Sequence, residues 1–161
     1  MNREPVKSTP VTRELDSKGI PYRLYTHPGS LLSLEQAAKE RGQCPEQVVR
    51  SIVFHLSEGD FLMVLVGGPS QISWSALRRY LGVSRIRMAN SEEVLARTGY
   101  ETGAVSPFAL SQPMPILVDE HVFREEELSI GSGIRYTTVI LRSDDLRRAL
   151  GEYQLGCFVK C

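Results

Sequence analysis

Two consecutive apolar segments near the middle of the chain most restrict the folds that it can adopt. VVRSIVFHL (48–56) is rich in β-branched residues, and FLMVLVGG (61–68) follows it after the turn EGD. Short apolar runs separated by turn residues are typical of paired strands. Because FLMVLV is apolar at consecutive positions, we expect a strand that is buried on both faces. The first strand should begin near Arg50 or Ser51, and the two should form a hairpin.

The remaining segments alternate between strand patterns and helix patterns. Strands are expected at 21–27, 83–89 and 114–119, and a second hairpin from LSI through GSG to IRYTTVILR. Helices are expected to open at Thr9-Pro10, to follow the cap residues Ser33 (with Gln36 as a capping box), Ser73 and Ser91, and to start at Ser143, Asp144 and Asp145. The tail EYQLGCFVKC gives no clear pattern. The order of elements predicts a single mixed α/β domain, with an at least partly antiparallel sheet and helices packed on it.

Composition narrows the class of protein. The chain has 161 residues, a length typical of one domain, and its 19 basic and 19 acidic side chains give a net charge of zero. A neutral domain is unsuited to extended, non-specific binding of nucleic acid. The polar start and the absence of a long apolar run predict neither a signal peptide nor a membrane span. The odd cysteine count (Cys44, Cys157 and Cys161) predicts free thiols in the cytoplasm, and no metal site is expected.

TGYETGAVSPFAL (98–110) is a glycine-containing connector with two possible interpretations. Gly99 and Gly103 permit a positive φ and close approach by a ligand. One interpretation is a helix C-cap at Gly99 followed by a turn at Gly103; the other is a wall of a binding site. The segment matches neither the P-loop nor the dinucleotide-binding pattern. The local sequence leaves both interpretations open.

Ser106 in this connector raises the question of a serine hydrolase. The nucleophile-elbow pattern G-x-S-x-G is absent. Pro107 also removes the backbone amide that would follow the serine as an oxyanion donor. A turn or hydrogen-bonding role is therefore favoured over a covalent nucleophile, which remains a third hypothesis.

Arg50 and His27 are the other candidates for a functional site. Arg50 begins an apolar strand, where its guanidinium could pair at the sheet edge or clamp a phosphate or carboxylate. It stays protonated and cannot be a general base. The three histidines, His27, His55 and His121, lie far apart without metal-ligand spacing. His27 is of most interest because it lies where a strand passes into a loop.

Taken together, several segments resemble one known family in the same order. G-Y-E-T-G-A-V-S-P-F-A (99–109) resembles the G-x-x-x-G-x-x-S/T-P-x-G loop of the YbaK/prolyl-tRNA-synthetase-associated family of aminoacyl-tRNA editing (deacylase) domains. Q-V-V-R-S-I-V-F (47–54) resembles its strand with a Lys-Ser/Thr pair, and S-W-S-A-L-R-R-Y-L-G (73–82) its next helix. I-L-V-D (116–119) resembles its strand ending in Asp, and I-G-S-G-I-R (130–135) with V-I-L-R-S-D-D-L (139–146) its closing hairpin and helix.

The resemblance implies a fold, a function and partners. The expected fold is mixed α+β: one domain over residues 1–161, with its core at about 10–151 and a largely antiparallel, partly barrel-like sheet surrounded by helices. Members hydrolyse the ester that joins a wrong amino acid to the 3′ end of a tRNA, often tRNA(Pro), and free-standing members act in trans. The implied partner is aminoacyl-tRNA, with a synthetase or translation factor as a further candidate. Cofactors, DNA and membranes are not expected.

The resemblance also assigns residues. Arg50 and Gly103 take the positions implied in catalysis, Gly103 through its backbone near the ester. Asp119 is expected to order a strand end rather than to react. The positions implied in substrate binding or in shaping its loop are Tyr25, His27, Ser51, Ala104, Ser106 and Pro107.

The chain departs from the family pattern at two positions. Arg50 stands where the family has lysine; it keeps the positive charge but not the compact ammonium geometry. Ala109 replaces the last glycine of the loop, which predicts that the backbone there does not need a positive φ. The leading hypothesis is a trans-acting deacylase, and the alternative is a non-catalytic module that binds the aminoacyl-tRNA end.

Overall fold

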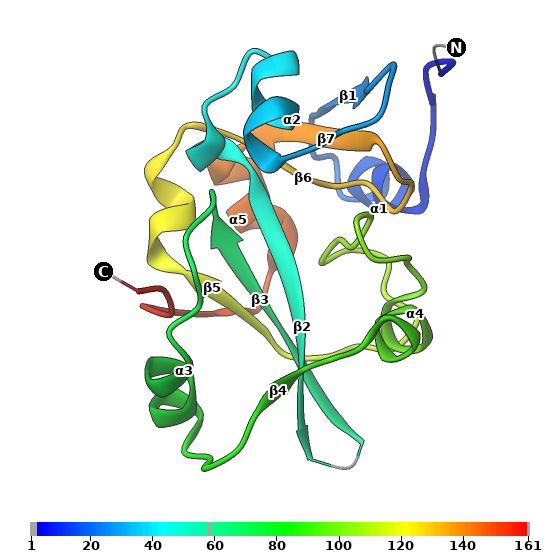
Figure 1. Cartoon of the computed structure of the whole chain (residues 1–161). Coiled ribbons are helices and arrows are strands. Elements are labelled where there is room, and N and C mark those ends of the chain that lie inside the picture. Colours follow the sequence, from blue (N-terminus) through cyan, green and yellow to red (C-terminus); the bar gives the residue numbers. More distant parts are fainter. Residues whose placement is uncertain (1–2, 58, 161) are drawn as a thin grey trace.

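The structure, a computed structural model that describes residues 3–57 and 59–160, has two sheets in contact (Figure 1). The larger sheet has the strand order β4-β2-β3-β5-β8, and the smaller has the order β1-β7-β6. A parallel bridge between Val48 and Ser129 joins the two. The strands are β1 (Arg23–Thr26), β2 (Val49–Ser57), β3 (Asp60–Gly67), β4 (Arg87–Met88), β5 (Ile116–Asp119), β6 (Glu127–Gly131), β7 (Thr137–Arg142) and β8 (Gln154–Gly156).

The predicted fold class is confirmed. Most strand pairs are antiparallel, whereas β5 runs parallel to both β3 and β8, and the sheets curve around a core without closing into a barrel. The helices are α1 (Pro10–Ser17), α2 (Leu34–Glu40), α3 (Trp74–Leu81), α4 (Ser91–Thr98) and α5 (Ser143–Leu150), with the 3₁₀ turns η1 (Pro45–Gln47) and η2 (Glu120–Arg124). No helix in the described residues has the length and apolar character needed to cross a bilayer.

Two predicted helix caps need correction. Asn90, not Ser91, is the N-cap of α4: its side chain accepts from the Glu93 amide at 2.9 Å, and the Glu93 carboxylate accepts from the Asn90 amide at 2.9 Å. Asparagine is an equally good cap, and the reciprocal carboxylate selects the earlier residue. Ser33 does cap α2, but Gln36 reaches the amide of Leu32 rather than that of Ser33, so the capping box is not formed there.

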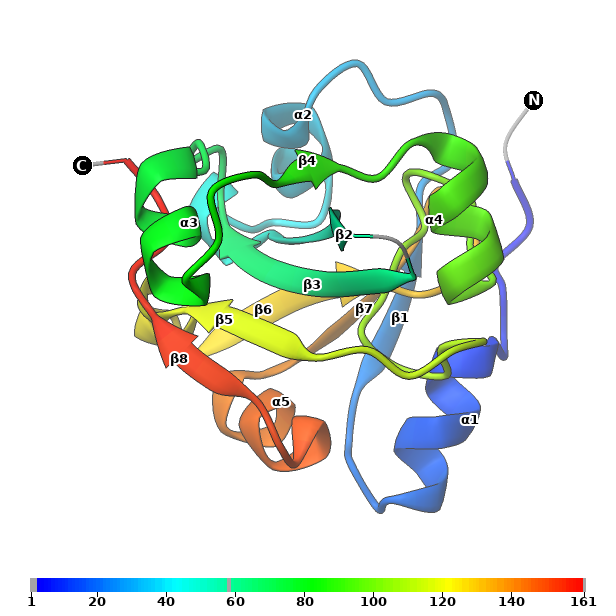
Figure 2. The ribbon, with the colours of Figure 1, turned by 90° about the horizontal axis from the view of Figure 1, so that it is seen from below.

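The central hairpin forms as predicted. β2 pairs with β3 from Val49 opposite Gly67 to Ser57 opposite Asp60, and the interior of β3 is buried throughout. The larger core is enclosed by both sheets with α1 and α5, and the smaller lies between the five-stranded sheet and α3. Figure 2 shows α3 and α5 on opposite sides of that sheet. Side chains alternate along β2, so Val49 and Val53 enter the larger core while Phe54 enters the smaller.

The second edge of β2 is open over a short stretch. Gly68 N donates to Val48 O at 2.7 Å, and Ala89 N donates to Val53 O at 2.9 Å. In an antiparallel pair, backbone groups alternate between the two edges of a strand. Val48 therefore bonds to the β3 side and Val53 to the opposite side. By the same alternation, the N–H and C=O of Ser51 point away from β3. Among the described residues no strand pairs with Ser51 on this edge, because the bridge to β6 is at Val48, the residue before β2, and β4 pairs only from Phe54.

The C-terminal tail, which gave no sequence pattern, completes the larger sheet. β8 lies parallel to β5, and Val159 forms a bridge with Ile72. Asp119 is fully buried and holds this arrangement, since its carboxylate accepts from the Phe158 amide at 2.8 Å and from the His121 amide at 3.0 Å. Asp119 therefore orders a strand end, as its sequence position predicts.

Candidate active site

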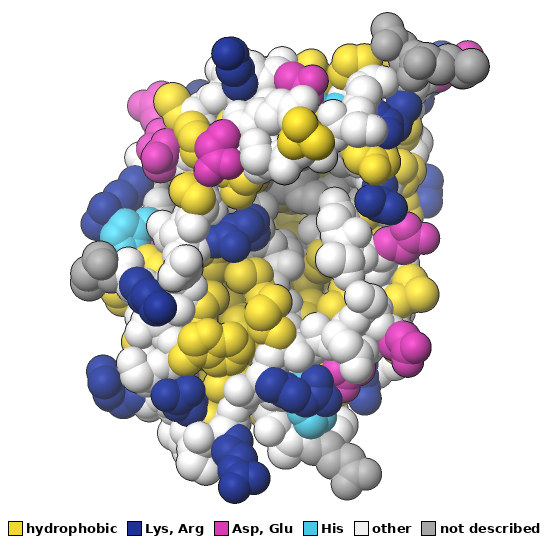
Figure 3. All heavy atoms as spheres, in the orientation of Figure 1, with side chains coloured by type: hydrophobic (Ala, Val, Ile, Leu, Met, Phe, Trp, Pro, Cys, Tyr) yellow, Lys and Arg dark blue, Asp and Glu magenta, His cyan; other side chains and the backbone are white. Residues whose placement is uncertain are grey.

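A cavity of about 590 Å³ lies at the open edge of β2. Its walls come from β2, β6, the end of α2, the start of α4 and the connector that contains Gly103. One side is apolar, with Val53, Met88 and Val94, whereas His27 and Ser129 contribute to a polar side. Figure 3 shows this face of the molecule as a hollow with apolar side chains around it and basic side chains near its border. The size is within the range of small-molecule sites.

The predicted site residues fall into two groups. His27, Arg50, Ser51 and Gly103 line the cavity. The other four do not line it: Tyr25 is half-buried, and the buried residues are Ala104, Ser106 and Pro107.

Tyr25 supports the wall from behind. Its ring meets that of His27 edge-on, with the ring centroids 4.9 Å apart, and its hydroxyl donates to the backbone carbonyl of Glu40 at 3.0 Å. Tyr25 therefore links β1 to the end of α2.

The glycine-containing connector combines both of its possible roles. Gly99 has φ 84° and caps α4, and Gly103 has φ 94° in a turn closed by the Ala104 amide and the Glu101 carbonyl at 3.0 Å. Gly103 also lies on the cavity wall with its backbone exposed. A turn of this kind leaves amides that can reach a ligand.

Tyr100 holds this connector in place. It is buried, and its hydroxyl lies 2.5 Å from the carbonyl oxygen of Phe108 and 3.0 Å from that of Ala109. Burial raises the pKa of Tyr100 to about 12, so the hydroxyl keeps its proton and remains a donor. The Ala109 amide is held as well, by the Glu14 carboxylate at 3.0 Å.

These contacts overturn the expectation for Ala109. Its φ is +54°, so the position does adopt the left-handed conformation that glycine would favour. In this conformation the Ala109 carbonyl accepts from Tyr100 in the same connector, and its amide donates to Glu14, which is 95 residues away in sequence. Ser106, by contrast, is fully buried and its Oγ accepts from the Phe108 amide at 3.3 Å, a turn contact consistent with the favoured interpretation.

Arg50 and Ser51 point to opposite faces of β2 because they are adjacent in a strand. The Arg50 side chain donates from Nε to the carbonyl of Gly68 at 2.9 Å and from Nη2 to the carbonyl of Ser70. Burial lowers the pKa of Arg50, but not enough to remove its charge. Ser51 Oγ is buried and has no hydrogen-bond partner among the described residues. A buried hydroxyl without a partner costs stability, so a ligand that bonded to it would relieve this cost.

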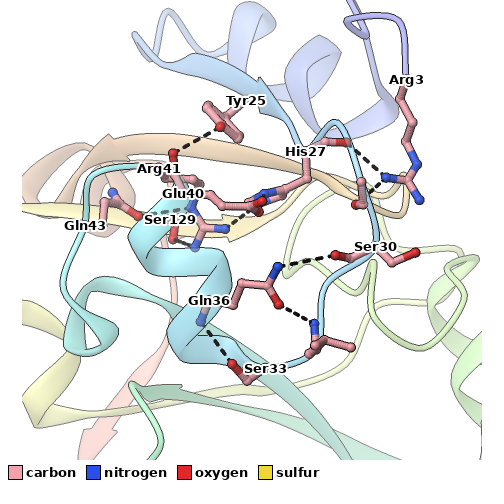
Figure 4. Close-up of polar contacts among 12 residues, drawn as sticks. Arg3, Tyr25, His27, Ser30, Ser33, Gln36, Glu40, Arg41, Gln43 and Ser129 are labelled. Carbon is pink, nitrogen blue, oxygen red and sulfur yellow. Dashed lines mark hydrogen bonds and ion pairs between the residues drawn. The ribbon is translucent and has the colours of Figure 1, made fainter. Parts of the chain in front are cut away.

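His27 belongs to a polar network that the sequence did not reveal (Figure 4). Its Nδ1 lies 2.7 Å from the Glu40 carboxylate, and its Nε2 lies 2.9 Å from Nη1 of Arg41. Arginine only donates, so Nε2 must accept and the proton of a neutral ring must be on Nδ1. Burial lowers the pKa of His27; the bond to Glu40 opposes this shift, and the charge of Arg41 adds to it.

Arg41 connects this network to β6. Its Nη2 donates to Ser129 Oγ at 2.9 Å, and its Nε donates to Gln43 Oε1 at 3.2 Å. The sequence signal for Arg41 is weak, since an arginine beside the glycine that ends a helix is common on protein surfaces. Its importance depends on α2 meeting β6, which are far apart in the chain.

Comparison with known proteins shows the family to which the chain belongs. The family model for the aminoacyl-tRNA editing domain matches residues 28–149. A proline–tRNA ligase of Kosmotoga olearia is 31% identical over 103 residues, which are 62% of this chain and 18% of that protein. The uncharacterized protein YwhH of Bacillus subtilis is 29% identical over 118 residues, 73% of this chain and 74% of that protein.

A solved structure described as a candidate trans-editing enzyme for prolyl-tRNA synthetase is also similar. It has a TM-score of 0.84 at 25% identity, and the match covers 96% of this chain and 100% of the other. The chain belongs to the aminoacyl-tRNA editing domain family. It spans only a small part of the proline–tRNA ligases that it matches, such as 15% of the one from Pelobacter propionicus and 22% of the one from Thermosipho melanesiensis.

Proposed function

We propose that the protein is a trans-acting aminoacyl-tRNA deacylase that removes a small, wrong amino acid from tRNA(Pro). Family membership and the prolyl-tRNA names of the relatives support this proposal. The observation that carries it is the cavity itself: its walls include the exposed backbone of Gly103 and the Oγ of Ser51, which has no hydrogen-bond partner among the described residues.

The proposed reaction is hydrolysis of the ester between the amino acid and the terminal ribose. A water molecule adds to the acyl carbon, the bond from that carbon to the ribose oxygen breaks, and the ribose oxygen takes up a proton. The products are the free amino acid and a free ribose hydroxyl. In the proposed site the Gly103 backbone faces the ester carbonyl, where fixed N–H donors stabilise the charge that develops on oxygen.

A separate hydrolytic site improves on selection by the synthetase. One methylene in an apolar pocket is worth only about 1–3 kcal/mol, so a synthetase rejects a slightly smaller amino acid only about 10–200-fold. The Val53, Met88 and Val94 wall gives the cavity an apolar surface against which a short side chain can pack. This cavity can then distinguish acyl groups smaller than proline from proline itself, after the synthetase has made the first selection.

Arg50 motivates a second proposal, a module that binds the aminoacyl-tRNA end without hydrolysis. The guanidinium keeps the positive charge of the family lysine, but two of its nitrogens donate to the carbonyls of Gly68 and Ser70. In the deacylase proposal, Arg50 shapes the cavity beside Ser51 and contributes its charge. In the binding proposal, it contributes the charge alone.

Purified protein incubated with Ala-, Cys- and Ser-tRNA(Pro) tests the two proposals. The deacylase proposal expects release of at least one amino acid above a buffer control, with correctly charged Pro-tRNA(Pro) spared. Binding without release from any mischarged tRNA supports the module and contradicts the deacylase. Arg50→Lys, assayed beside the native protein, shows by a gain in rate whether the arginine limits hydrolysis.

Ser51→Ala is the companion variant, with Ser57→Ala as its matched control. Ser57 is exposed and its Oγ bonds to Asp60 at 2.7 Å at the far end of β2. Loss of rate or affinity in Ser51→Ala alone is the expected result. Equal behaviour of the two variants would argue that substrate does not contact Ser51.

A further inference from the structure

Arg41 lies at the end of the cavity where α2 meets β6, on a different element from the Gly103 connector. It is held on three sides by His27, Gln43 and Ser129. Each contact uses a different nitrogen of the guanidinium, so the plane of the group is fixed. A fixed guanidinium loses little side-chain entropy when it binds a ligand.

The hydrogen-bond capacity of Arg41 is not exhausted by these contacts. A guanidinium carries five N–H groups, and the described residues accept from three of them, one on Nε and one on each terminal nitrogen. One N–H therefore remains on each terminal nitrogen. The Ser129 hydroxyl accepts from Arg41, and its own proton has no acceptor among the described residues. Three donors are thus available at this end of the cavity.

Among the described residues no carboxylate accepts a hydrogen bond from Arg41. Its three acceptors are uncharged, and the nearby Glu40 carboxylate, whose charge favours the protonated guanidinium, bonds to His27 instead. Burial lowers the pKa of Arg41, yet the group stays protonated. A partly desolvated cation attracts an anion more strongly than an exposed one does, because the local dielectric constant is lower.

We propose that Arg41 and Ser129 form an oxyanion-binding subsite in this cavity, for a carboxylate or a phosphate of the ligand. The planar fork of arginine matches both groups. In the proposed reaction, the anion is either a phosphate of the nucleotide portion of the substrate or the carboxylate of the amino acid that hydrolysis releases. This identity of the ligand rests on the proposed function; the subsite itself does not.

Direct binding tests the subsite without any hydrolysis. The ¹⁵N-labelled full chain is titrated with acetate, with inorganic phosphate and with the neutral acetamide at constant ionic strength, and the Nε–H resonance of Arg41 is followed. We expect a saturable shift with an anion and none with acetamide. A stronger response to acetate assigns the subsite to the released amino acid, and a stronger response to phosphate assigns it to the nucleotide end of the substrate. Equal shifts with acetamide, or no saturable shift, would overturn the proposal.

Three variants test whether the anion binds at Arg41. Arg41→Met should weaken anion binding at least 10-fold, while Arg79→Met, the same change at an exposed arginine on α3, should leave it within about 2-fold. Arg41→Lys keeps a donor for His27 if the methionine variant proves unstable, and it too should weaken binding because the fork is lost. Native affinity in folded Arg41→Lys and Arg41→Met would refute the assignment.

The two proposals fail in distinguishable ways. If mischarged tRNA is hydrolysed but no anion shifts Arg41, only the subsite is wrong. If anions bind through Arg41 but no mischarged tRNA is hydrolysed, the subsite stands and the deacylase proposal is wrong.

Discussion

Tyr100→Phe removes one hydroxyl and leaves the aromatic ring in place. That hydroxyl is buried and holds the Phe108 and Ala109 carbonyls at 2.5 Å and 3.0 Å. Leaving buried polar groups without a partner costs about 1–3 kcal/mol. For a domain of this size each kcal/mol corresponds to about 2–4 °C in Tm, so the expected fall is about 2–12 °C.

Urea unfolding followed by circular dichroism measures this loss, and an unchanged slope shows that the unfolded state is the same. Tyr80→Phe is the matched control, because the Tyr80 hydroxyl donates to Gln154 at 2.8 Å from an exposed ring. The control should change stability by less than about 0.5 kcal/mol. Similar losses in both variants, or none in Tyr100→Phe, would refute the idea that this hydroxyl fixes the connector.

Three further predictions concern the same region. Ala109→Gly should raise the free energy of unfolding by up to about 1 kcal/mol, because alanine is strained at φ +54°; thermal denaturation checks this, and a clear loss contradicts it. His27 has a folded-state pKa below its ordinary 6.5, so the unfolded state binds more protons and stability should fall as pH drops below about 6.5. Between pH 7.5 and 5, the Tm of His27→Gln should depend less on pH than the Tm of the native protein does. An equal pH dependence of Tm in the two proteins would contradict this prediction. Gly131→Ala should destabilise by about 1–3 kcal/mol, since a Cβ there overlaps the Val105 carbonyl, whereas Gly29→Ala, with open space around it, should be nearly neutral in urea unfolding; equal effects would exclude the clash.

Local patterns were sufficient for most of the fold. The continuous apolar run of β3 and the glycine that ends α4 are determined by neighbours in the sequence, so both were predictable. The prediction placed the N-cap of α4 one residue too late, at Ser91 instead of Asn90. Serine and asparagine are near-equivalent caps, and the reciprocal bond between Asn90 and Glu93 decides between them.

The site was less predictable, for a physical reason. Gly103 and His27 lie where a glycine turn and a strand exit already suggest binding, and both line the cavity. Arg41 acquires its role only by meeting Ser129, which is 88 residues away in sequence. The conformation of Ala109 likewise depends on a carboxylate 95 residues away, that of Glu14. No local pattern contains such contacts.

The open stretch of the β2 edge is short, because a neighbouring strand bonds to the chain at each end of it. The bridge to β6 is at Val48, the residue before the strand, and β4 resumes pairing at Phe54, so the outward backbone groups between them centre on Ser51. An exposed sheet edge normally pairs with other strands and leads to aggregation. Here the Val53 carbonyl already accepts from Ala89, so the gap covers residues 49–52 and is shorter than a typical strand of about 5–6 residues. The edge can therefore offer backbone hydrogen bonds to a single small ligand while it excludes an extended polypeptide.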